Sequence, residues 1–210
     1  MSYRAIFFDL DDTLYPSNTG LWDLIGERID LFMHDVVGLD WSIIPEKRQT
    51  LFNQYGTTLR GLVAEYHIDS AHYLDFVHDV PIEKILSPSP DLKTKIGNLE
   101  KQKYIFTNAD RKHALRVISI LQLDGCFDQI IDICDMEPFC KPQKEAFEKA
   151  LHLAGDLEPS EVIIIDDTPR NLETAIQMGS PAIQVGTRPT VPGVVAHIEE
   201  INLLDQVISF

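Results

Sequence analysis

Two acidic residues, Asp9 and Asp11, lie two positions apart directly after a short apolar run at residues 5–8. Residues two apart in an extended chain project to the same side, so both carboxylates can point into one space. Such a pair can divide the work of group transfer between a nucleophile and a proton donor, or it can bind a hard cation. The alternative is a plain turn, because Asp-Asp-Thr at residues 11–13 is common in loops.

A second apolar run, at residues 162–165, also ends in acids, Asp166 and Asp167. Two such strand ends would gather at least four uncompensated carboxylates, and their repulsion favours a bound cation. Ligands that are all oxygen indicate Mg²⁺. The alternative is a helix cap, because Thr168 and Pro169 are typical of a helix start. Both interpretations can hold together, with Thr168 as the cap and Asp166 as a functional residue.

Two weaker signals lie between the acidic pairs. Thr107 and Asn108 follow an apolar run at residues 104–106 and precede an expected helix, where small polar groups can bind an anion. Lys141 stands just before another expected helix, and its charge could hold a phosphate and offset the carboxylates. Taken singly, the first signal is typical of a helix cap and the second of a solvated lysine.

The elements that must position these residues alternate along the chain. Apolar runs typical of strands buried on both faces occur at residues 5–8, 104–106, 130–133, 162–165 and 182–185. Segments with helical spacing separate the later runs, the last of them between Thr168 and Gly179. This alternation predicts an α/β fold with a doubly wound, Rossmann-like parallel sheet. The tail after Gly186 regains helical spacing and is expected to complete the core.

Residues 17–86 interrupt the alternation, because they show helical spacing and no convincing strand. Helices are expected near residues 21–36, 59–66 and 70–78. We therefore expect an all-helical cap domain at residues 17–86, inserted into a core formed by residues 1–16 and 87–210. Ligands in such sheets bind beyond the carboxyl ends of the strands, so this insert would lie over the site.

The composition limits the classes of partner. The 210 residues carry 33 acidic and 18 basic side chains, a net charge of −15. This balance argues against nucleic acid and anionic membranes as partners, but it allows a small phosphorylated metabolite if a metal reverses the local charge. Three cysteines without a CxxC pair fit a reducing compartment. We expect no signal peptide and no membrane span, hence a cytoplasmic protein, while the oligomeric state is not indicated.

The ordered set of motifs resembles that of the haloacid dehalogenase-like superfamily of phosphotransferases. The matches are, in chain order, Asp9 with Asp11 and Thr13, then Thr107, Lys141, and Asp166 with Asp167. The resemblance covers about residues 4–186, and the helical insert resembles the smaller cap type of that superfamily. Within it, the pyrimidine 5′-nucleotidase branch is the most similar, through residues 11–16, 56–62 and 73–79.

The resemblance implies a Mg²⁺-dependent phosphatase that acts on a small phosphate monoester, in the first place a pyrimidine nucleoside 5′-monophosphate. Asp9 would attack phosphorus and form an aspartyl-phosphate, while Asp11 would protonate the leaving oxygen and then deprotonate water. Mg²⁺ would bind the Asp9 carboxylate, the Asp11 backbone carbonyl, and either Asp166 or Asp167 directly. The phosphoryl oxygens would be held by Thr107, Asn108 and Lys141.

Two residues are candidates for substrate specificity. Arg60 lies between Gly56 and Gly61, which could let the backbone approach a ligand, so Arg60 could contact the leaving group. An ordinary surface arginine is an equal interpretation. Tyr15 could stack on a base, although packing beneath the cap is slightly favoured.

Several alternatives belong to the same superfamily. A 2-haloacid dehalogenase normally lacks the second acid of the first motif, and a phosphonatase-type enzyme needs a cap lysine, for which only Lys47 and Lys84 are available. A sugar phosphomutase or a phosphoglycolate-type phosphatase would share the catalytic residues, so both stay open. A regulatory binding module on this scaffold would be expected to lack at least one motif residue, and all are present.

Overall fold

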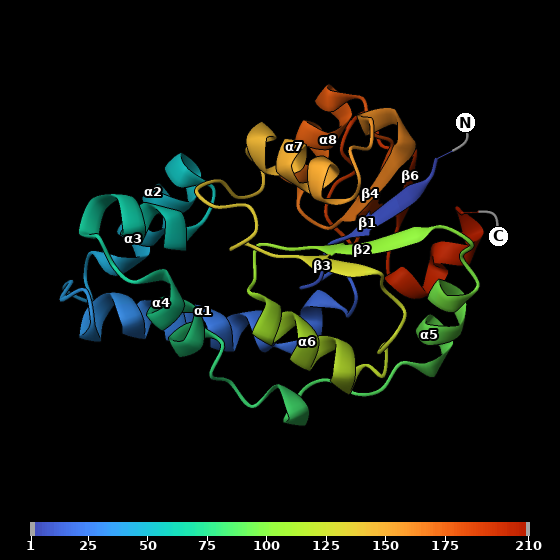
Figure 1. The fold of residues 1–210 in the computed structure, drawn as a ribbon. Helices are drawn as coiled ribbons and strands as arrows, with labels where there is room; N and C mark the ends of the chain where they lie inside the picture. Colours follow the sequence, from blue (N-terminus) through green and yellow to red (C-terminus); the bar gives the residue numbers. More distant parts are fainter. Residues whose placement is uncertain (1–2, 209–210) are drawn as a thin grey trace.

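The computed structural model describes residues 3–208 and contains one six-stranded parallel sheet (Figure 1). Its strands are β1 (Ala5–Phe8), β2 (Gln102–Phe106), β3 (Gln129–Ile131), β4 (Val162–Asp166), β5 (Ala182–Val185) and β6 (Ala196–Ile198). The order across the sheet is β3-β2-β1-β4-β5-β6, which confirms the doubly wound fold. The winding reverses between β1 and β4, and in such sheets ligands bind beyond the carboxyl ends of the strands at this point.

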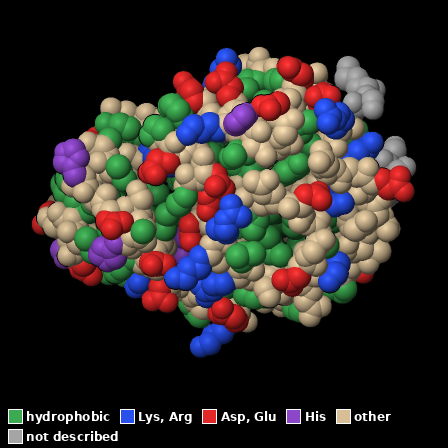
Figure 2. Space-filling view, in the orientation of Figure 1, with side chains coloured by type: hydrophobic (Ala, Val, Ile, Leu, Met, Phe, Trp, Pro, Cys, Tyr) green, Lys and Arg blue, Asp and Glu red, His purple; other side chains and the backbone are tan. Residues whose placement is uncertain are grey.

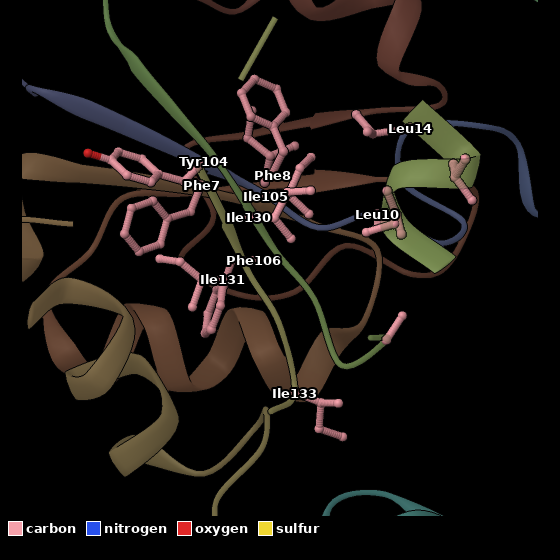
Figure 3. Close-up of a cluster of buried hydrophobic side chains, with 14 of the residues drawn as sticks. Phe7, Phe8, Leu10, Leu14, Tyr104, Ile105, Phe106, Ile130, Ile131 and Ile133 are labelled. Atoms are coloured by element: carbon pink, nitrogen blue, oxygen red, sulfur yellow. The ribbon is translucent and has the colours of Figure 1, made fainter. Parts of the chain in front are cut away.

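The central strands are covered on both sides, which explains their continuous apolar runs. All four residues of β1 and all five of β4 are buried. Phe7 meets Tyr104 and Phe106 edge to face, with ring centroids 5.2 and 5.7 Å apart (Figure 3). This packing makes the sheet a rigid base for the polar residues that follow the strands.

Helices cover both faces of the sheet (Figure 1). On one face lie α7 (Lys144–Leu153) and α8 (Pro169–Met178), and on the other α5 (Pro90–Gly97) and α6 (Arg111–Ile120). The α8 helix has Pro at its first position and ends at Gly179, which adopts a left-handed conformation. Its boundaries are those that the sequence predicts.

The tail packs onto the core as expected, with Ile198, Ile201 and Leu204 buried, but only part of it is helical. It contributes the edge strand β6, paired with β5, and then a 3₁₀ helix at Ile201–Gln206. The edge strand has only three residues and two of them are half-buried. A strand this short shows no readable alternation of apolar and polar residues, so its sequence gives no strand signal.

Within residues 17–86 the chain forms four α-helices, and residues 9–101 contain no strand. They are α1 (Leu21–Asp35), α2 (Ile44–Tyr55), α3 (Thr58–Tyr66) and α4 (Ser70–Val77). The predicted helical insertion is therefore confirmed, and α2, α3 and α4 gather on the left of Figure 1. The α2 helix was not predicted, because only Ile44 and Leu51 of its 12 residues are buried and no apolar stripe results.

The surface shown in Figure 2 carries acidic and basic side chains interspersed with apolar ones. Two tryptophans of the helical insertion, Trp22 and Trp41, are about half exposed. Across residues 3–208, the structure holds no helix with the length and hydropathy that a membrane crossing requires.

Candidate active site

Three carboxylates meet where β1 and β4 end. The two strands pair in parallel with Phe8 opposite Ile165, so the next residues, Asp9 and Asp166, lie side by side at the carboxyl edge of the sheet. Asp9, Asp166 and Asp167 are buried, and each carries an oxygen within 4.8 Å of the others. The structure thus brings together the two acidic motifs, which are far apart in the sequence.

Lys141 provides a positive charge between these acids. Its ammonium donates to Asp9 Oδ1 at 2.7 Å, to Asp166 Oδ2 at 2.8 Å and to the Phe106 carbonyl at 2.7 Å. Burial would lower the pKa of Lys141, but Asp166 and Asp9 outweigh burial and raise it. The side chain is only 1% exposed, so this lysine is a fixed charge in the site rather than a solvated one.

Asp166 and Asp167 differ in their partners. Both oxygens of Asp166 are engaged, by Lys141, by the backbone N–H of Thr168 and by the Asn171 amide. Asp167 accepts the Thr168 hydroxyl at 3.1 Å and pairs with the half-exposed Arg188 at 3.0 Å. Asp166 is therefore held inside a network, whereas Asp167 has partners that can rearrange.

Negative charge remains in excess at this site. Burial raises the pKa of Asp167 to about 6, and the charge of Asp166 adds to the effect. Burial also raises the pKa of Asp9 well above its usual value, although Lys141 opposes the shift. The three carboxylates are hard oxygen donors, which fit a divalent cation such as Mg²⁺ that would relieve the repulsion.

Thr107 and Asn108 follow β2 and line the same cavity, but they have different surroundings. The Thr107 hydroxyl oxygen accepts a hydrogen bond from the N–H of Ala109 at 3.0 Å. The hydroxyl proton of Thr107 therefore remains available to donate to a group bound in the cavity. The Asn108 amide forms two 2.9 Å hydrogen bonds, one to the backbone carbonyl of Lys141 and one from its N–H. Asn108 therefore anchors the loop that carries Lys141.

Asp11 turns to another set of partners. Its Oδ1 accepts the Tyr15 hydroxyl at 2.6 Å and lies 2.9 Å from Nε2 of His113. Burial would raise the pKa of Asp11, but His113 and Tyr15 outweigh burial and lower it. The Asp11 carboxylate lines the cavity without joining the group formed by Asp9, Asp166 and Asp167.

His113 is a site residue that sequence reasoning missed, as are Asn171 and Arg188, the partners of Asp166 and Asp167. His113 lies on α6, its side chain is fully buried, and it reaches Asp11 from 102 positions away in the chain. No motif surrounds it, and its neighbours Ala114 and Val117 are ordinary core residues. Tyr15 also enters the site through Asp11, and its ring is not among those that line the cavity.

Arg60 does not occupy the place that the sequence suggested. Its guanidinium donates to the carbonyls of Ile133 and Phe139 at 2.6 and 3.1 Å and pairs with Glu137 at 3.0 Å. The residue is 7% exposed and does not line the cavity. It joins α3 to the loop after β3 and provides the hydrogen-bond donor for two backbone carbonyls of that loop.

The two glycines near Arg60 permit close packing rather than contact with a ligand. Gly56 has φ of +90°, and a Cβ there would lie 2.8 Å from the sulfur of Cys140, next to Lys141. A Cβ at Gly61 would lie 2.7 Å from Leu51 of α2. The helical insertion thus rests directly on the loop that carries the active-site lysine.

A cavity of about 990 Å³ lies between the strand ends and the helical insertion. The core side of the cavity includes Asp9, Asp11, Thr107, Asn108, Lys141 and Asp167. The opposite side includes polar residues, such as Asp23, Asp30, Arg48 and Gln49, and the apolar residues Trp22, Ile25, Ile29, Phe52, Leu74 and Val77. A polar reaction centre therefore faces an apolar wall formed by these last six residues, with room for a small organic molecule.

Residues 3–179 match a family model described as haloacid dehalogenase-like hydrolase. The chain belongs to this family. The match extends from β1 to the end of α8, so it covers both acidic motifs, the helical insertion and Lys141. The identified family is the one that the ordered motifs resemble.

Among curated proteins, "Phosphate metabolism protein 8" of Saccharomyces cerevisiae is 29% identical over 191 residues, which are 84% of this chain. A mouse protein, "Acyl-CoA dehydrogenase family member 10", is 26% identical over 196 residues, which are 88% of this chain. The matched part is 59% of the yeast protein and 18% of the mouse protein, so the chain spans only part of either relative.

Solved structures share the fold over nearly all of the chain. The magnesium-bound HAD-hydrolase YfnB of Bacillus subtilis has a TM-score of 0.66 at 18% identity, with both chains covered completely. A HAD phosphatase of Thermococcus onnurineus has a TM-score of 0.62 at 16% identity, with 98% of each chain covered. The L-2-haloacid dehalogenase of Xanthobacter autotrophicus has a TM-score of 0.61 at 14% identity, with 97% of each covered.

Proposed function

We propose that this hydrolase is a Mg²⁺-dependent phosphatase that cleaves a small phosphate monoester, namely a pyrimidine nucleoside 5′-monophosphate. The observation that carries the proposal is the position of Lys141, with its ammonium 2.7 Å from Asp9 and 2.8 Å from Asp166. A buried cation there would orient the Asp9 nucleophile and bind a phosphoryl oxygen. Phosphoryl transfer needs such positioning and charge stabilisation above all.

Asp9 and Asp11 would carry the two halves of the reaction. Asp9 attacks phosphorus and forms an aspartyl-phosphate, while Asp11 gives a proton to the leaving oxygen. Asp11 then accepts a proton from the water that hydrolyses the aspartyl-phosphate. Lys141 and the Thr107 hydroxyl stabilise the phosphoryl oxygens, and Asn108 keeps the Lys141 loop in place.

The Asp9 carboxylate, the backbone carbonyl of Asp11 and Asp167 would hold the Mg²⁺. The hydrogen bonds favour Asp167 over Asp166 as the direct ligand. The partners of Asp166 are the buried Lys141 and Asn171 and a backbone N–H, whereas those of Asp167 are the Thr168 hydroxyl and the half-exposed Arg188, which can move aside. Asp166 would then act on the ion through water. When bound, the ion neutralises charge on the phosphoryl group and the carboxylates.

The side of the cavity opposite the strand ends favours an uncharged organic leaving group. Of the arginines that line the cavity, Arg48 is engaged by Asp30 and the Gly26 carbonyl, Arg170 on α8 by the carbonyls of Phe52 and Gly56, and Arg188 by Asp167. Phosphoglycolate would leave as an anion and would need a cation of its own. A nucleoside instead offers a planar apolar surface to Trp22 and Phe52.

The helical insertion would serve as a cap, with residues 17–86 as one domain and residues 1–16 and 87–210 as the core. Its apolar wall would exclude bulk water from the reaction centre once a substrate is bound. Small phosphorylated metabolites would be the partners of this cavity, since a macromolecular substrate would have to displace the insertion.

The Asp9→Asn variant tests the nucleophile. We expect its turnover of p-nitrophenyl phosphate with Mg²⁺ to fall by at least about 10³-fold, because an amide cannot form the aspartyl-phosphate. Circular dichroism should show that the variant keeps its fold. A wild-type rate in Asp9→Asn would contradict the assignment, and an inert wild-type protein would contradict the phosphatase proposal.

A substrate screen tests the leaving group. We expect UMP and CMP to give higher kcat/KM than phosphoglycolate or hexose phosphates, because of the apolar wall. Conversion of one sugar phosphate to its isomer without release of phosphate would instead identify a phosphomutase. Phosphoglycolate as the best substrate would contradict the argument from the engaged arginines.

A further inference from the structure

His113 stands beside the proposed proton donor, and no part of the reaction described so far uses it. Its side chain is fully buried, and its Nε2 lies 2.9 Å from Oδ1 of Asp11. The Nδ1 atom of the same ring is buried without a hydrogen-bond partner among the described residues. A buried nitrogen without a partner destabilises the folded protein, so core packing alone does not explain a histidine here.

We propose that His113 is a positioning residue that, with Tyr15, selects which oxygen of Asp11 faces the substrate. This role rests on the proposed phosphatase function. Both hydrogen bonds converge on Oδ1, at 2.9 Å from His113 and 2.6 Å from Tyr15. Among residues 3–208, Oδ2 of Asp11 has no hydrogen-bond partner, and Asp11 lines the cavity. Oδ2 is therefore the oxygen that meets the leaving group.

The direction of the hydrogen bond follows from the acceptor. A carboxylate oxygen can only accept, so the His113 ring must carry its proton on Nε2, in one neutral form or in the protonated form. The other neutral form would place two acceptors 2.9 Å apart. The Tyr15 hydroxyl likewise donates to Oδ1, so both donors keep the proton of Asp11 off that oxygen and leave Oδ2 as the oxygen that carries it.

The His113 ring is held in this orientation by the helical insertion. His78, which directly follows α4, stacks on it with ring centroids 4.2 Å apart and an interplanar angle of 21°. His78 Nδ1 lies 2.6 Å from Oδ1 of Asp110, the residue that caps α6. Because His113 is the third residue of α6, the insertion and the helix cap together prevent the ring from turning.

The chemical step shows why the choice of oxygen matters. As the Asp9 oxygen bonds to phosphorus, the bond between phosphorus and the leaving oxygen breaks, and that oxygen takes the proton from Oδ2 of Asp11. Asp11 becomes a carboxylate, which later removes a proton from the attacking water. The protons of His113 and Tyr15 stay where they are and hold Oδ1 throughout. Without these donors the carboxyl group can rotate and present the wrong oxygen.

A leaving-group comparison tests this role. The p-nitrophenolate ion departs without a proton, whereas the alkoxide of UMP needs one. The measurement is kcat/KM for both esters, because this ratio does not include hydrolysis of the phosphoenzyme. In His113→Leu we expect kcat/KM for UMP to fall about 30- to 100-fold and that for p-nitrophenyl phosphate to fall less than about fivefold.

Two further variants separate positioning from stability. His113→Gln retains an N–H donor, so its kcat/KM for UMP should recover to within about tenfold of the wild-type value. Tyr15→Phe removes the second donor with little change of shape and should show the same selective loss, which keeps the test decisive if His113→Leu does not fold. His152→Gln, an exposed substitution on α7, is the matched control.

Equal losses for both esters, or a glutamine variant as slow as the leucine variant, would overturn the positioning role and leave the phosphatase proposal intact. The positioning role would also be overturned if His113→Leu and Tyr15→Phe both kept the wild-type kcat/KM for UMP. A wild-type protein that hydrolyses neither ester would overturn the proposed function and this role with it. If UMP alone is inert, the best alkyl phosphate from the substrate screen takes its place.

Discussion

At the residue scale, the site combines one fixed positive charge with a surplus of negative charge. Lys141 contacts Asp9 and Asp166 directly, yet Asp167 keeps a raised pKa of about 6 because it is buried beside Asp166. A carboxyl group whose pKa is raised in the folded state destabilises that state increasingly as pH rises from its ordinary pKa, about 4, to the shifted value, and the full effect remains above it. Above about pH 6, the charge of Asp167 therefore opposes folding until a cation is bound.

Asp167→Asn tests this balance without any substrate. Near neutral pH and without metal, we expect the variant to be more stable than the wild type by about 1–3 kcal/mol, because a buried charge is removed. Thermal unfolding with and without Mg²⁺ should show a rise in Tm for the wild type and little or none for Asp167→Asn. The exposed substitution Asp124→Asn is the control. An undiminished Mg²⁺ effect in Asp167→Asn would contradict direct ligation.

Removal of the metal is expected to stop turnover. Excess EDTA should abolish phosphatase activity, and added Mg²⁺ should restore it, because the ion must offset the charges of the carboxylates and the phosphoryl group. The measurement is the rate of p-nitrophenyl phosphate hydrolysis before and after chelation. A rate that EDTA does not change would remove the metal from the proposal.

At the element scale, the helical insertion is joined to the core through the loop of Lys141. Gly56 follows α2 and lies against Cys140, while Arg60 on α3 donates to carbonyls of residues 133 and 139. Arg170 on α8 donates to the carbonyls of Phe52 and Gly56 from the other side. The position of the insertion and that of Lys141 are therefore mechanically linked.

Gly56→Ala tests this link. The new methyl group would lie 2.8 Å from the Cys140 sulfur and 3.2 Å from the backbone carbonyl oxygen of Lys141, so the Cys140 side chain or the Lys141 loop must shift. We expect kcat/KM to fall about 10-fold or more, with a loss of stability of about 1–3 kcal/mol. Steady-state kinetics and thermal unfolding are the measurements.

Gly38→Ala is a matched control for the Gly56 variant. Gly38 has φ of +84°, close to the +90° of Gly56, but a Cβ there meets no atom within 4 Å. Both variants carry similar backbone strain, and only Gly56→Ala adds the collision with the core. Equal effects of the two substitutions on kcat/KM would show that strain, and not contact with the Lys141 loop, is responsible.

At the scale of the whole molecule, the net charge of −15 opposes the approach of an anionic substrate. Both signs of charge occur on the face in Figure 2. The repulsion follows from the overall excess of acidic side chains, 33 against 18 basic ones. Salt screens such long-range repulsion more than it weakens buried contacts within the site. The acidic composition therefore affects the rate at which a phosphate ester associates with the protein, whereas the residues of the site determine the rate of the chemical step.

A change of ionic strength tests this effect. With Mg²⁺ saturating, we expect kcat/KM to rise about two- to fivefold as KCl increases from about 20 to about 200 mM, because screening weakens the repulsion. The value of kcat should change less, since it is measured with substrate already bound. A fall in kcat/KM would indicate that positive potential around the cavity outweighs the net charge.

The insertion and the strand ends could be predicted because local rules govern them. Strands buried on both faces must be apolar, so β1 and β4 appear as uninterrupted runs, and the acids that follow them must lie at one edge of a parallel sheet. The helix α2 and the edge strand β6 could not be predicted in this way. Too few of their residues are buried to leave a periodic pattern.

The sequence by itself determined the parallel sheet, the helical insertion and the polar residues that reach the strand ends. Only the tertiary structure decided the direction in which individual side chains point. In the folded protein the Arg60 guanidinium points toward the core, and the Asn108 amide donates to the backbone carbonyl of Lys141. His113 lies next to Asp11, although 102 positions separate them in the sequence. These contacts join separate elements, and hydrogen bonds between elements depend on packing that no local pattern of residues records.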